Sequence, residues 1–307
     1  MNKIERRDVD VAIIGSGLAG LFAALTAAES ASVLVLTRQD IKASNSWFAQ
    51  GGIAAVWDHA DSTEDHAADT LVAGAGLCDP AAVRVLVTEG PDRVRDLIGF
   101  GAQFDAAVGG NLLLTREGAH GRRRILHAHG DATGRELERT LIDRVRSHAR
   151  IECRENFHAA DLLKRCSDGR IIGVRGFDGP ERRPVEVRAR CVILACGGLG
   201  RLFPETTNPE QATGDGVAIA WAAGARLADL EFVQFHPTVF VAPGHPRFLV
   251  SEAVRGEGAV LENPAGERFM KRYHPMADLA PRDIVARAVL AEMQHAATDH
   301  VFLDARH

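Results

Sequence analysis

The sequence predicts an α/β fold: a Rossmann-like dinucleotide-binding domain with an antiparallel β-meander insertion, followed by a partial α+β capping domain. Three observations support this prediction. An apolar run at residues 9–14 leads into a G-x-G-x-x-G motif, several strand-like segments follow at residues 151–187, and regular periodicity weakens after Asp229. We therefore expect the first domain to cover residues 1–229 and the second to cover residues 230–307.

The glycine motif at residues 15–20 lies between the first expected strand and an Ala/Leu-rich helix. Gly15 permits the tight turn, Gly17 lets the backbone approach a pyrophosphate, and Gly20 allows close packing of the helix on the strand. The helix N-terminus also offers N–H groups to an anion. The motif therefore predicts a dinucleotide bound near the start of the chain.

A second strand is expected at residues 32–36, at the spacing that a βαβ unit requires. Where an acidic residue usually follows to hold the ribose, this chain has Thr37 and then Arg38. Thr37 can hydrogen-bond a ribose hydroxyl, and Arg38 can reach a phosphate. The residues by themselves leave both FAD and NADP open.

The middle of the chain changes from a helix pattern to a run of strands. An amphipathic helix is expected at residues 134–149. The strands that follow are expected at residues 151–154, 159–164, 171–177 and 185–187, and we interpret them as the antiparallel meander. Residues 191–195 then predict a buried strand that ends at a double glycine and returns to the central sheet beside the nucleotide.

The last third of the chain is expected to be rich in loops, with a small-residue helix at residues 213–223 before it. A final helix starts at Pro281, and its buried face is formed by Ile284, Val285, Ala288, Val289 and Ala291 and closed by Glu292. Arg282 falls in its first turn, where the helix dipole disfavours a cation. An anionic substrate, or an acidic partner such as Asp283, would explain that placement.

Composition excludes several classes of function. Of the 307 residues, 46% are hydrophobic and 25% charged, and the net charge of −5 argues against nucleic acid as a partner. No stretch reaches the roughly 18 apolar residues of a membrane helix, so no membrane association is expected. The five cysteines include no C-x-x-C pair, which favours a reduced, cytoplasmic location.

Three other features are interpreted as structural. His127 and His129 lack a Cys, Asp or Glu at metal-site spacing, so no metal is expected. Cys191 and Cys196 lie at opposite ends of one expected strand, too far apart for a disulfide. The arginines at residues 122–124 are expected to be solvated or internally paired rather than to bind an anion.

Several motifs together resemble the succinate dehydrogenase/fumarate reductase flavoprotein family. They are AQGGIAA at residues 49–55, LTREG at 114–118, DATGR at 131–135, QFHPT at 234–238, RGEGA at 255–259 and APRDIV at 280–285. The resemblance extends over nearly the whole chain and implies that the dinucleotide is FAD. It also implies that family members continue beyond residue 307, so we expect the chain to be C-terminally incomplete and the strand at residues 301–304 to lack partners.

The resemblance implies which residues meet the cofactor. The ADP portion would contact Gly15, Ser16, Gly17, Leu18, Ala19, Gly20 and Arg38, the flavin would be wrapped by Ser44, Asn45, Ser46, Trp47, Phe48, Ala49, Gln50, Gly51 and Gly52, and Ala159 and Asp215 would lie near. Related subunits tether FAD through a histidine at the position of Asn45. Because an amide cannot replace the imidazole nucleophile, we expect FAD to be bound non-covalently.

The resemblance also implies a substrate site. His236, Ser251 and Arg282 would bind a C4 dicarboxylate and handle protons, although the family usually has Thr at the position of Ser251. Glu117 would discriminate between substrates, because a carboxylate opposite an ammonium favours aspartate whereas an amide would suit succinate.

The expected reaction is oxidation of L-aspartate to iminoaspartate, with hydride leaving C2 for flavin N5 and with oxygen or fumarate as the electron acceptor. The resemblance further implies that this reaction begins NAD synthesis by way of quinolinate, with a functional link to quinolinate synthase. Two alternatives stay open: an enzyme that reduces fumarate or oxidises succinate, and a non-catalytic nucleotide-binding fragment.

Overall fold

The computed structural model describes residues 4–245 and 247–306. The chain divides into two compact units. The first unit is formed by Met1–Gln50, Arg95–Phe104 and Ala128–Glu231, and the second by Gly51–Val94, Asp105–His127 and Phe232–His307. The outer limits of the expected domains, at residues 1 and 307, lie outside the described residues. Each unit thus draws on three separate stretches of the chain.

The first unit is built on a six-stranded sheet with the order β6-β2-β1-β9-β8-β7. Its strands are β1 (Glu5–Ile14), β2 (Val33–Leu36), β6 (Ile151–Arg154), β7 (Phe157–Lys164), β8 (Ile171–Asp178) and β9 (Arg183–Leu194). β6, β2, β1 and β9 pair in parallel, whereas β7, β8 and β9 pair antiparallel. This arrangement confirms the α/β fold and the antiparallel meander.

Two details of the expected meander are wrong. Residues 151–154 do not belong to it, because β6 pairs in parallel with β2. The helix that precedes β6 supplies the crossover that a parallel strand needs. The segments at 185–187 and 191–195 are one strand, β9, whose exposed Arg188 and Arg190 alternate with buried Val187 and Ala189. This alternation interrupts the apolar pattern without ending the strand.

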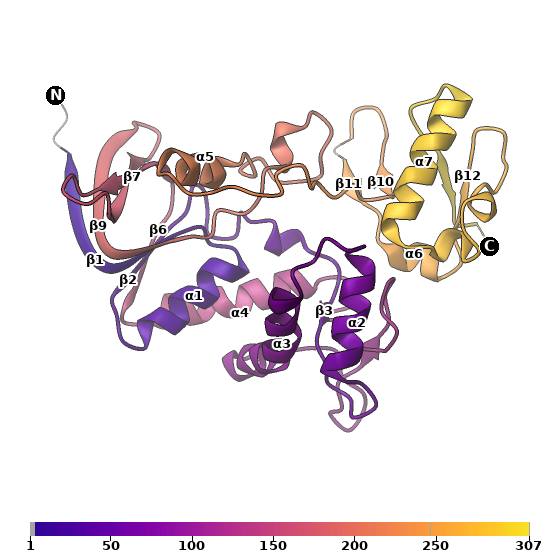
Figure 1. Cartoon of the computed structure of the whole chain (residues 1–307), viewed down its shortest axis with the longest axis horizontal. Helices are drawn as coiled ribbons and strands as arrows, with labels where there is room; N and C mark the ends of the chain where they lie inside the picture. The colour runs from indigo at the N-terminus through magenta and orange to yellow at the C-terminus, as the bar shows by residue number, and fades with distance from the viewer. Residues whose placement is uncertain (1–3, 246, 307) are drawn as a thin grey trace. The chain divides into compact units, whose positions relative to one another are not determined.

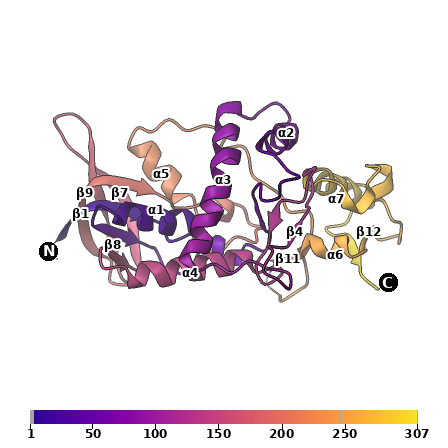
Figure 2. The same ribbon diagram turned by 90° about the horizontal axis from the view of Figure 1, so that it is seen from below.

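Helices cover the sheet. α1 (Leu18–Ala28) and α4 (Thr133–Ser147) lie side by side, and α5 (Asp215–Ala222) packs near β7, as Figures 1 and 2 show. The core cluster that includes Ile219 of α5 takes alternate residues of the central strands, among them Ala12, Ile14, Leu34 and Leu36. Their neighbours Ile13, Val33 and Val35 are also buried, so both faces of the central strands are covered, as their unbroken apolar runs require.

The second unit contains helices and short strands that the sequence did not reveal. They are α2 (Thr63–Ala73), most of α3 (Pro80–Phe100), and a sheet of β3 (Ile53–Ala54), β5 (Ile125–Leu126) and β4 (Leu114–Thr115) in the order β3-β5-β4. Strands of two residues are too short to show an alternating pattern. α3 contains Pro91 in its interior, which normally signals the end of a helix.

The rest of the second unit carries β10 (Val239–Phe240), β11 (Phe248–Leu249), α6 (Glu252–Gly256), β12 (Val260–Glu262), α7 (Arg282–Ala296) and β13 (Phe302–Asp304). α7 is the expected final helix, but it continues past Glu292, which is itself buried. The expectation that residues 301–304 lack partners is wrong, since β13 pairs antiparallel with β12.

No helix within the described ranges is long and apolar enough to cross a membrane. All five cysteines are free thiols. Among residues 4–245 and 247–306, no group of three His, Cys, Asp or Glu side chains is arranged to hold a metal ion.

Candidate functional site

A cavity of about 310 Å³ opens in the first unit at the carboxyl ends of β1, β2 and β9. The predicted cofactor residues that line it are Gly15, Ser16, Gly17, Leu18, Ala19, Arg38, Ser44, Asn45, Ser46, Ala159 and Asp215. Gly20, Trp47, Phe48, Ala49, Gln50, Gly51 and Gly52 are not part of its lining. The site thus lies where the loops that follow parallel strands meet, the usual binding position in such sheets.

The glycine motif has the geometry that its sequence requires. Gly15 has φ +117°, and a Cβ there would lie 2.1 Å from the Ala195 carbonyl oxygen. A Cβ on Gly20 would lie 2.0 Å from the Gly15 carbonyl oxygen, so α1 packs closely on the turn as predicted. Gly17 caps α1, whose first turn holds no acidic residue. The helix N-terminus therefore presents its positive end to the cavity without a competing carboxylate.

Polar side chains fix the loop after β2. The buried Ser16 hydroxyl lies 3.0 Å from the Thr37 hydroxyl and donates to the Ile41 carbonyl oxygen at 2.9 Å. The Arg38 guanidinium donates to Asp215 at 2.9 Å and to Thr213 at 2.8 Å. Arg38 and Asp215, predicted separately from distant motifs, therefore meet at one edge of the cavity.

The segment after Ser44 is held by α4. The Ser44 hydroxyl donates to the carboxylate of Glu138 and accepts the N–H of Trp47 at 3.0 Å. Glu138 has an exposed fraction of 0%, its second oxygen has no hydrogen-bond partner, and burial raises its pKa to about 7. Sequence reasoning missed Glu138, because nothing in a helical repeat marks a carboxylate that faces inward.

Glu117 belongs to the second unit, in the loop that follows β4. Its carboxylate lies 3.4 Å from Nε2 of His127, which also lies 2.9 Å from the Thr115 hydroxyl. A Cβ added to Gly51 would lie 4.0 Å from Glu117 Oε1, so the double glycine passes close to this carboxylate. A predicted cofactor segment and the predicted substrate-discriminating residue are therefore neighbours.

A second group of charges gathers around Arg282, at the first residue of α7. Its Nε donates to Glu252 Oε1 at 2.7 Å, and the same oxygen accepts from Arg255 Nη2 at 3.1 Å. The arginine in the first turn is thus paired with an acid, which was one of the two explanations offered for its placement. The acid is Glu252, because Asp283 pairs with Arg287 instead. Glu252 was not predicted, because it lies 30 residues from Arg282 in no recognisable pattern.

His236 lies near these charges. Burial lowers the pKa of His236, and the positive charge of Arg282 lowers it further, which keeps the imidazole neutral near pH 7. Its Nδ1 is engaged by Thr238, with the carbonyl oxygen at 3.0 Å and the amide nitrogen at 3.2 Å. The engagement of Nδ1 leaves Nε2 for a ligand. Ser251 immediately precedes Glu252 and is partly buried.

Arg255 was noted only as part of a motif, and its environment is unusual. It is 4% exposed, donates to the Asp278 carbonyl oxygen at 2.5 Å, and has a buried Nε with no hydrogen-bond partner. Burial lowers the pKa of its guanidinium. The Arg282 and Arg255 guanidinium groups share the Glu252 carboxylate, and the negative charge of Asp278 also acts on Arg255. The partly exposed Arg282 guanidinium can still bind an anionic ligand.

Comparison with known proteins gives concordant results. The family model described as FAD binding domain matches residues 10–307. An L-aspartate oxidase of Streptomyces coelicolor is 52% identical, over 97% of this chain and 52% of that protein. One from a Nostoc species is 48% identical, over 97% of this chain and 51% of that protein. A quinol fumarate reductase structure from E. coli superimposes with a TM-score of 0.91 at 31% identity, over 99% of this chain and 55% of that one.

The chain spans about half the length of the curated relatives that it matches.

Proposed function

The chain belongs to the FAD-binding domain family, and from this premise we propose that it is the FAD-binding part of an L-aspartate oxidase. The proposed reaction is oxidation of L-aspartate to iminoaspartate, which would begin NAD synthesis. The single observation that favours aspartate over its dicarboxylate analogues is Glu117. Its carboxylate can pair with the ammonium of aspartate, which succinate and fumarate lack.

The first unit fits the cofactor. The cradle of Gly15, Gly17 and Gly20 leaves no room for a Cβ at the first and third positions. The start of α1, where the N-cap residue Gly17 has no side chain to accept the helix N–H groups, suits a pyrophosphate. When bound, FAD supplies the two-electron oxidant. We propose that the lining residues of the cavity hold its ADP portion and that residues 44–52 contact the flavin. Asn45 in the lining has no nucleophilic nitrogen, which supports non-covalent binding.

We propose that His236, Ser251 and Arg282 hold the substrate carboxylates. A neutral imidazole can donate from Nε2 to a carboxylate oxygen, and the guanidinium of Arg282 can bind another. Glu252 accepts from Arg282 at 2.7 Å and would orient it. These groups align the C2–H bond, balance the two negative charges and exclude water. Glu117 accepts from the substrate ammonium and so fixes which dicarboxylate is aligned.

The main alternative is an enzyme that reduces fumarate or oxidises succinate, which the 31% identity to a quinol fumarate reductase keeps open. Steady-state rates with aspartate, succinate and fumarate distinguish the two functions in the full-length protein reconstituted with FAD. We expect aspartate to give the highest kcat/KM as an electron donor. Faster oxidation of succinate than of aspartate would refute the proposal.

Arg282 tests the substrate clamp. We expect Arg282→Ala to lower kcat/KM for aspartate by about 100-fold or more, because a charge-assisted hydrogen bond and a counter-charge are lost together. Arg282→Lys keeps the charge and should recover part of the loss. Turnover near that of the parent in both variants would remove Arg282 from the site.

The remaining parts of the proposal concern partners and location. We propose oxygen or fumarate as the electron acceptor and a functional link to quinolinate synthase, which would consume iminoaspartate. The cofactor domain would comprise residues 1–229 and the capping domain residues 230–307. Five free thiols suit a reduced cytoplasm, and cell fractionation tests that location.

A further inference from the structure

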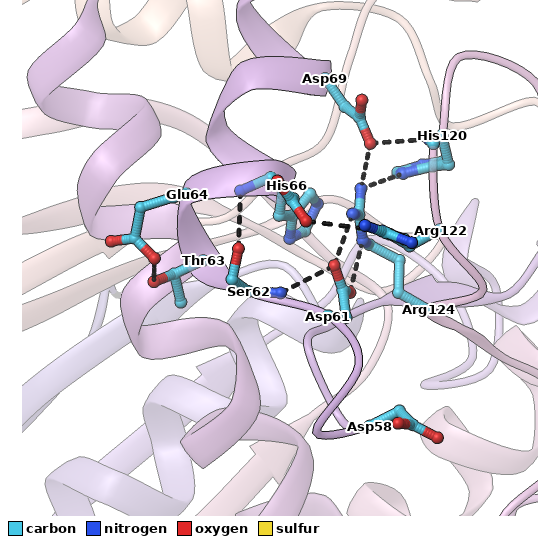
Figure 3. A network of polar contacts seen from close by, with 12 residues as sticks. Asp58, Asp61, Ser62, Thr63, Glu64, His66, Asp69, His120, Arg122 and Arg124 are labelled. Atoms are coloured by element: carbon cyan, nitrogen blue, oxygen red, sulfur yellow. Dashed lines mark hydrogen bonds and ion pairs between the residues drawn. The ribbon is translucent and has the colours of Figure 1, made fainter.

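A buried polar network in the second unit lies beside the loop that carries Glu117. Figure 3 shows Arg124 between Asp61 and Asp69, with His66 and His120 close by. The Arg124 side chain has an exposed fraction of 0% and that of Asp61 an exposed fraction of 2%. No residue of this network belongs to the proposed cofactor or substrate site. A charge buried this completely is stabilised only when it is paired on several sides.

Arg124 is paired through both its side chain and its backbone. Its Nε and Nη2 donate to the two oxygens of Asp61 at 2.8 and 2.7 Å, and Nη1 donates to Asp69 at 2.5 Å. Its N–H donates to the Thr115 carbonyl oxygen at 3.1 Å, and its own carbonyl accepts the N–H of Ala55 at 3.0 Å. Arg124 therefore anchors the base of the hairpin between β4 and β5.

The same carboxylate holds the tip of that hairpin. Asp69 accepts the N–H of Gly121 at 2.7 Å, so one side chain of α2 binds both the loop and Arg124. Within the loop, the N–H of His120 donates to the Glu117 carbonyl oxygen at 3.3 Å. The connection from α2 to Glu117 thus consists of Asp69, Gly121 and His120, without any contact to the Glu117 carboxylate itself.

His120 adds a contact that depends on its protonation. Its Nδ1 lies 3.2 Å from Arg124 Nη1, and because a guanidinium can only donate, this nitrogen accepts. Its pKa is lowered by burial and by the positive charge of Arg124, while Asp69, Glu117 and Asp61 act in the opposite direction. The neighbouring His66, whose ring centroid is 5.7 Å away, has its pKa lowered for the same two reasons. A neutral His120 imidazole near pH 7 preserves its contact with Arg124.

We propose that Asp61, Asp69 and Arg124 form a positioning network that fixes the loop carrying Glu117 and thereby sharpens selection of an amino dicarboxylate over one without the ammonium. The proposal rests on the proposed function for its substrate. Its physical basis is that a selecting carboxylate must be held within a fraction of an ångström to favour one ligand, and residues 116–123 have only two-residue strands at their base. The buried ion network supplies the rigidity that these strands do not.

The test uses the full-length protein loaded with FAD, three single variants and a Glu117→Gln background. Asp69→Ala removes both the acceptor for Gly121 and the counter-charge of Arg124, whereas Asp69→Asn keeps an acceptor and loses the charge. The matched control is Asp65→Ala on the same helix, because Asp65 contacts the same loop through an exposed pair with Arg122 at 3.5 Å. Flavin content and thermal unfolding identify any variant that fails to fold.

We expect Asp69→Ala to lower kcat/KM for aspartate about tenfold, mainly through KM, and to change KM for succinate less than about twofold. Asp69→Asn should recover part of the loss, and Asp65→Ala should match the parent. In a Glu117→Gln background, Asp69→Ala should no longer change the aspartate-to-succinate preference. A merely structural role of Asp69 would give the same effect with and without Glu117. Hydrogen exchange should be faster for the amides of residues 117–124 in Asp69→Ala than in the parent.

The inference would be overturned either by the exchange measurement or by the kinetics. The contradicting exchange result is an unchanged rate of residues 117–124 in a folded Asp69→Ala protein, which needs no assumption about the substrate. The contradicting kinetic result is an equal loss with aspartate and succinate, or the same loss with and without Glu117. If the parent itself does not oxidise aspartate, the proposed function and the proposed effect on substrate selection fail together. The exchange measurement still decides whether the network positions the loop.

Discussion

At the scale of single residues, Glu117 differs from a glutamine in its negative charge and in having an acceptor oxygen where glutamine has an NH₂ donor group. The Glu117 side chain has an exposed fraction of 33%, and its carboxylate lies 3.4 Å from Nε2 of His127. The carboxylate is therefore accessible to a ligand. An ammonium gains a counter-charge from the carboxylate, whereas succinate gains nothing from it.

Glu117→Gln is therefore expected to lower kcat/KM for aspartate by about tenfold or more and to leave succinate oxidation unchanged or improved. Steady-state kinetics with both substrates measure the ratio. Glu89→Gln, at an exposed position of α3, is the control and should behave as the parent. An unchanged preference in Glu117→Gln would remove this residue from the account of specificity.

Glu138 shows how a buried carboxyl makes stability depend on pH. Burial raises its pKa from 4.5 to about 7. Because the folded value lies above the unfolded value, its contribution to stability is fully present below pH 4.5 and is lost as the pH rises through 7. Above that range the folded chain carries a buried charge with only the Ser44 hydroxyl to stabilise it.

Glu138→Gln is expected to raise the free energy of unfolding by about 2 kcal/mol more at pH 8 than at pH 5, because the amide cannot ionise. Urea unfolding of parent and variant at both pH values measures this difference. Glu136→Gln is a matched control on the same helix: although burial raises the pKa of Glu136, hydrogen bonds from Arg139 and from the Gln103 N–H lower it overall. Its effect should be the same at pH 5 and 8. A pH-independent effect of Glu138→Gln would contradict the assignment.

At the scale of elements, the close approach of α4 to the segment after Ser44 depends on Gly134. A Cβ at this position would lie 2.0 Å from the Ser46 carbonyl oxygen and 2.7 Å from the Ala49 Cβ. The Gly134 N–H donates to the Ala49 carbonyl oxygen at 3.0 Å. The segment thus rests directly on the helix backbone.

Gly134→Ala is expected to displace residues 46–49 and to weaken FAD binding by about tenfold or more, since overpacking at such a contact costs about 1–3 kcal/mol. Titration of apoprotein with FAD, followed by flavin fluorescence, gives the affinity. Gly90→Ala in α3, where a Cβ meets nothing within 4 Å, should bind FAD as the parent does and gain slightly in stability. FAD affinity equal to that of the parent in Gly134→Ala would show that this contact does not shape the site.

At the scale of the whole molecule, cofactor binding is linked to folding. The cavity takes its lining from several segments between Ile14 and Ile219, and these segments come together only in the folded chain. A ligand bound there stabilises the folded state by mass action.

FAD at about 100 times its Kd is expected to stabilise the chain by roughly 2.7 kcal/mol and to raise Tm by a few degrees. Thermal unfolding at increasing FAD concentration, together with flavin absorbance at about 450 nm after gel filtration, measures both effects. NADP at the same concentrations is the matched control, because Arg38 can reach a phosphate and the residues by themselves are compatible with NADP as well as FAD. An equal rise of Tm with NADP, or none with FAD, would contradict the cofactor.

The sequence by itself determined the phosphate cradle, the strands that surround it and the final helix. Gly20 is recognisable because its constraint is local: a Cβ there would clash with the carbonyl of Gly15 in the same motif. Gly15 is recognisable because its positive φ favours glycine, although the atoms that a Cβ would meet belong to the distant Ala195. Strand and helix periodicity likewise depends on near neighbours. The family motifs added Glu117, His236, Ser251 and Arg282 as separate points on the chain.

Only the tertiary structure decided which of these points meet and what holds them. The partner of Ser44 is Glu138, that of Arg282 is Glu252, and those of Arg124 are Asp61 and Asp69. No period or motif connects such residues, because an ion pair requires only that two side chains come close in the folded chain. The pairing of β6 with β2 is likewise decided by the tertiary structure. The crossover helix α4 carries the chain to the edge of the sheet beside β2, so β6 does not pair with the strand that follows it in sequence.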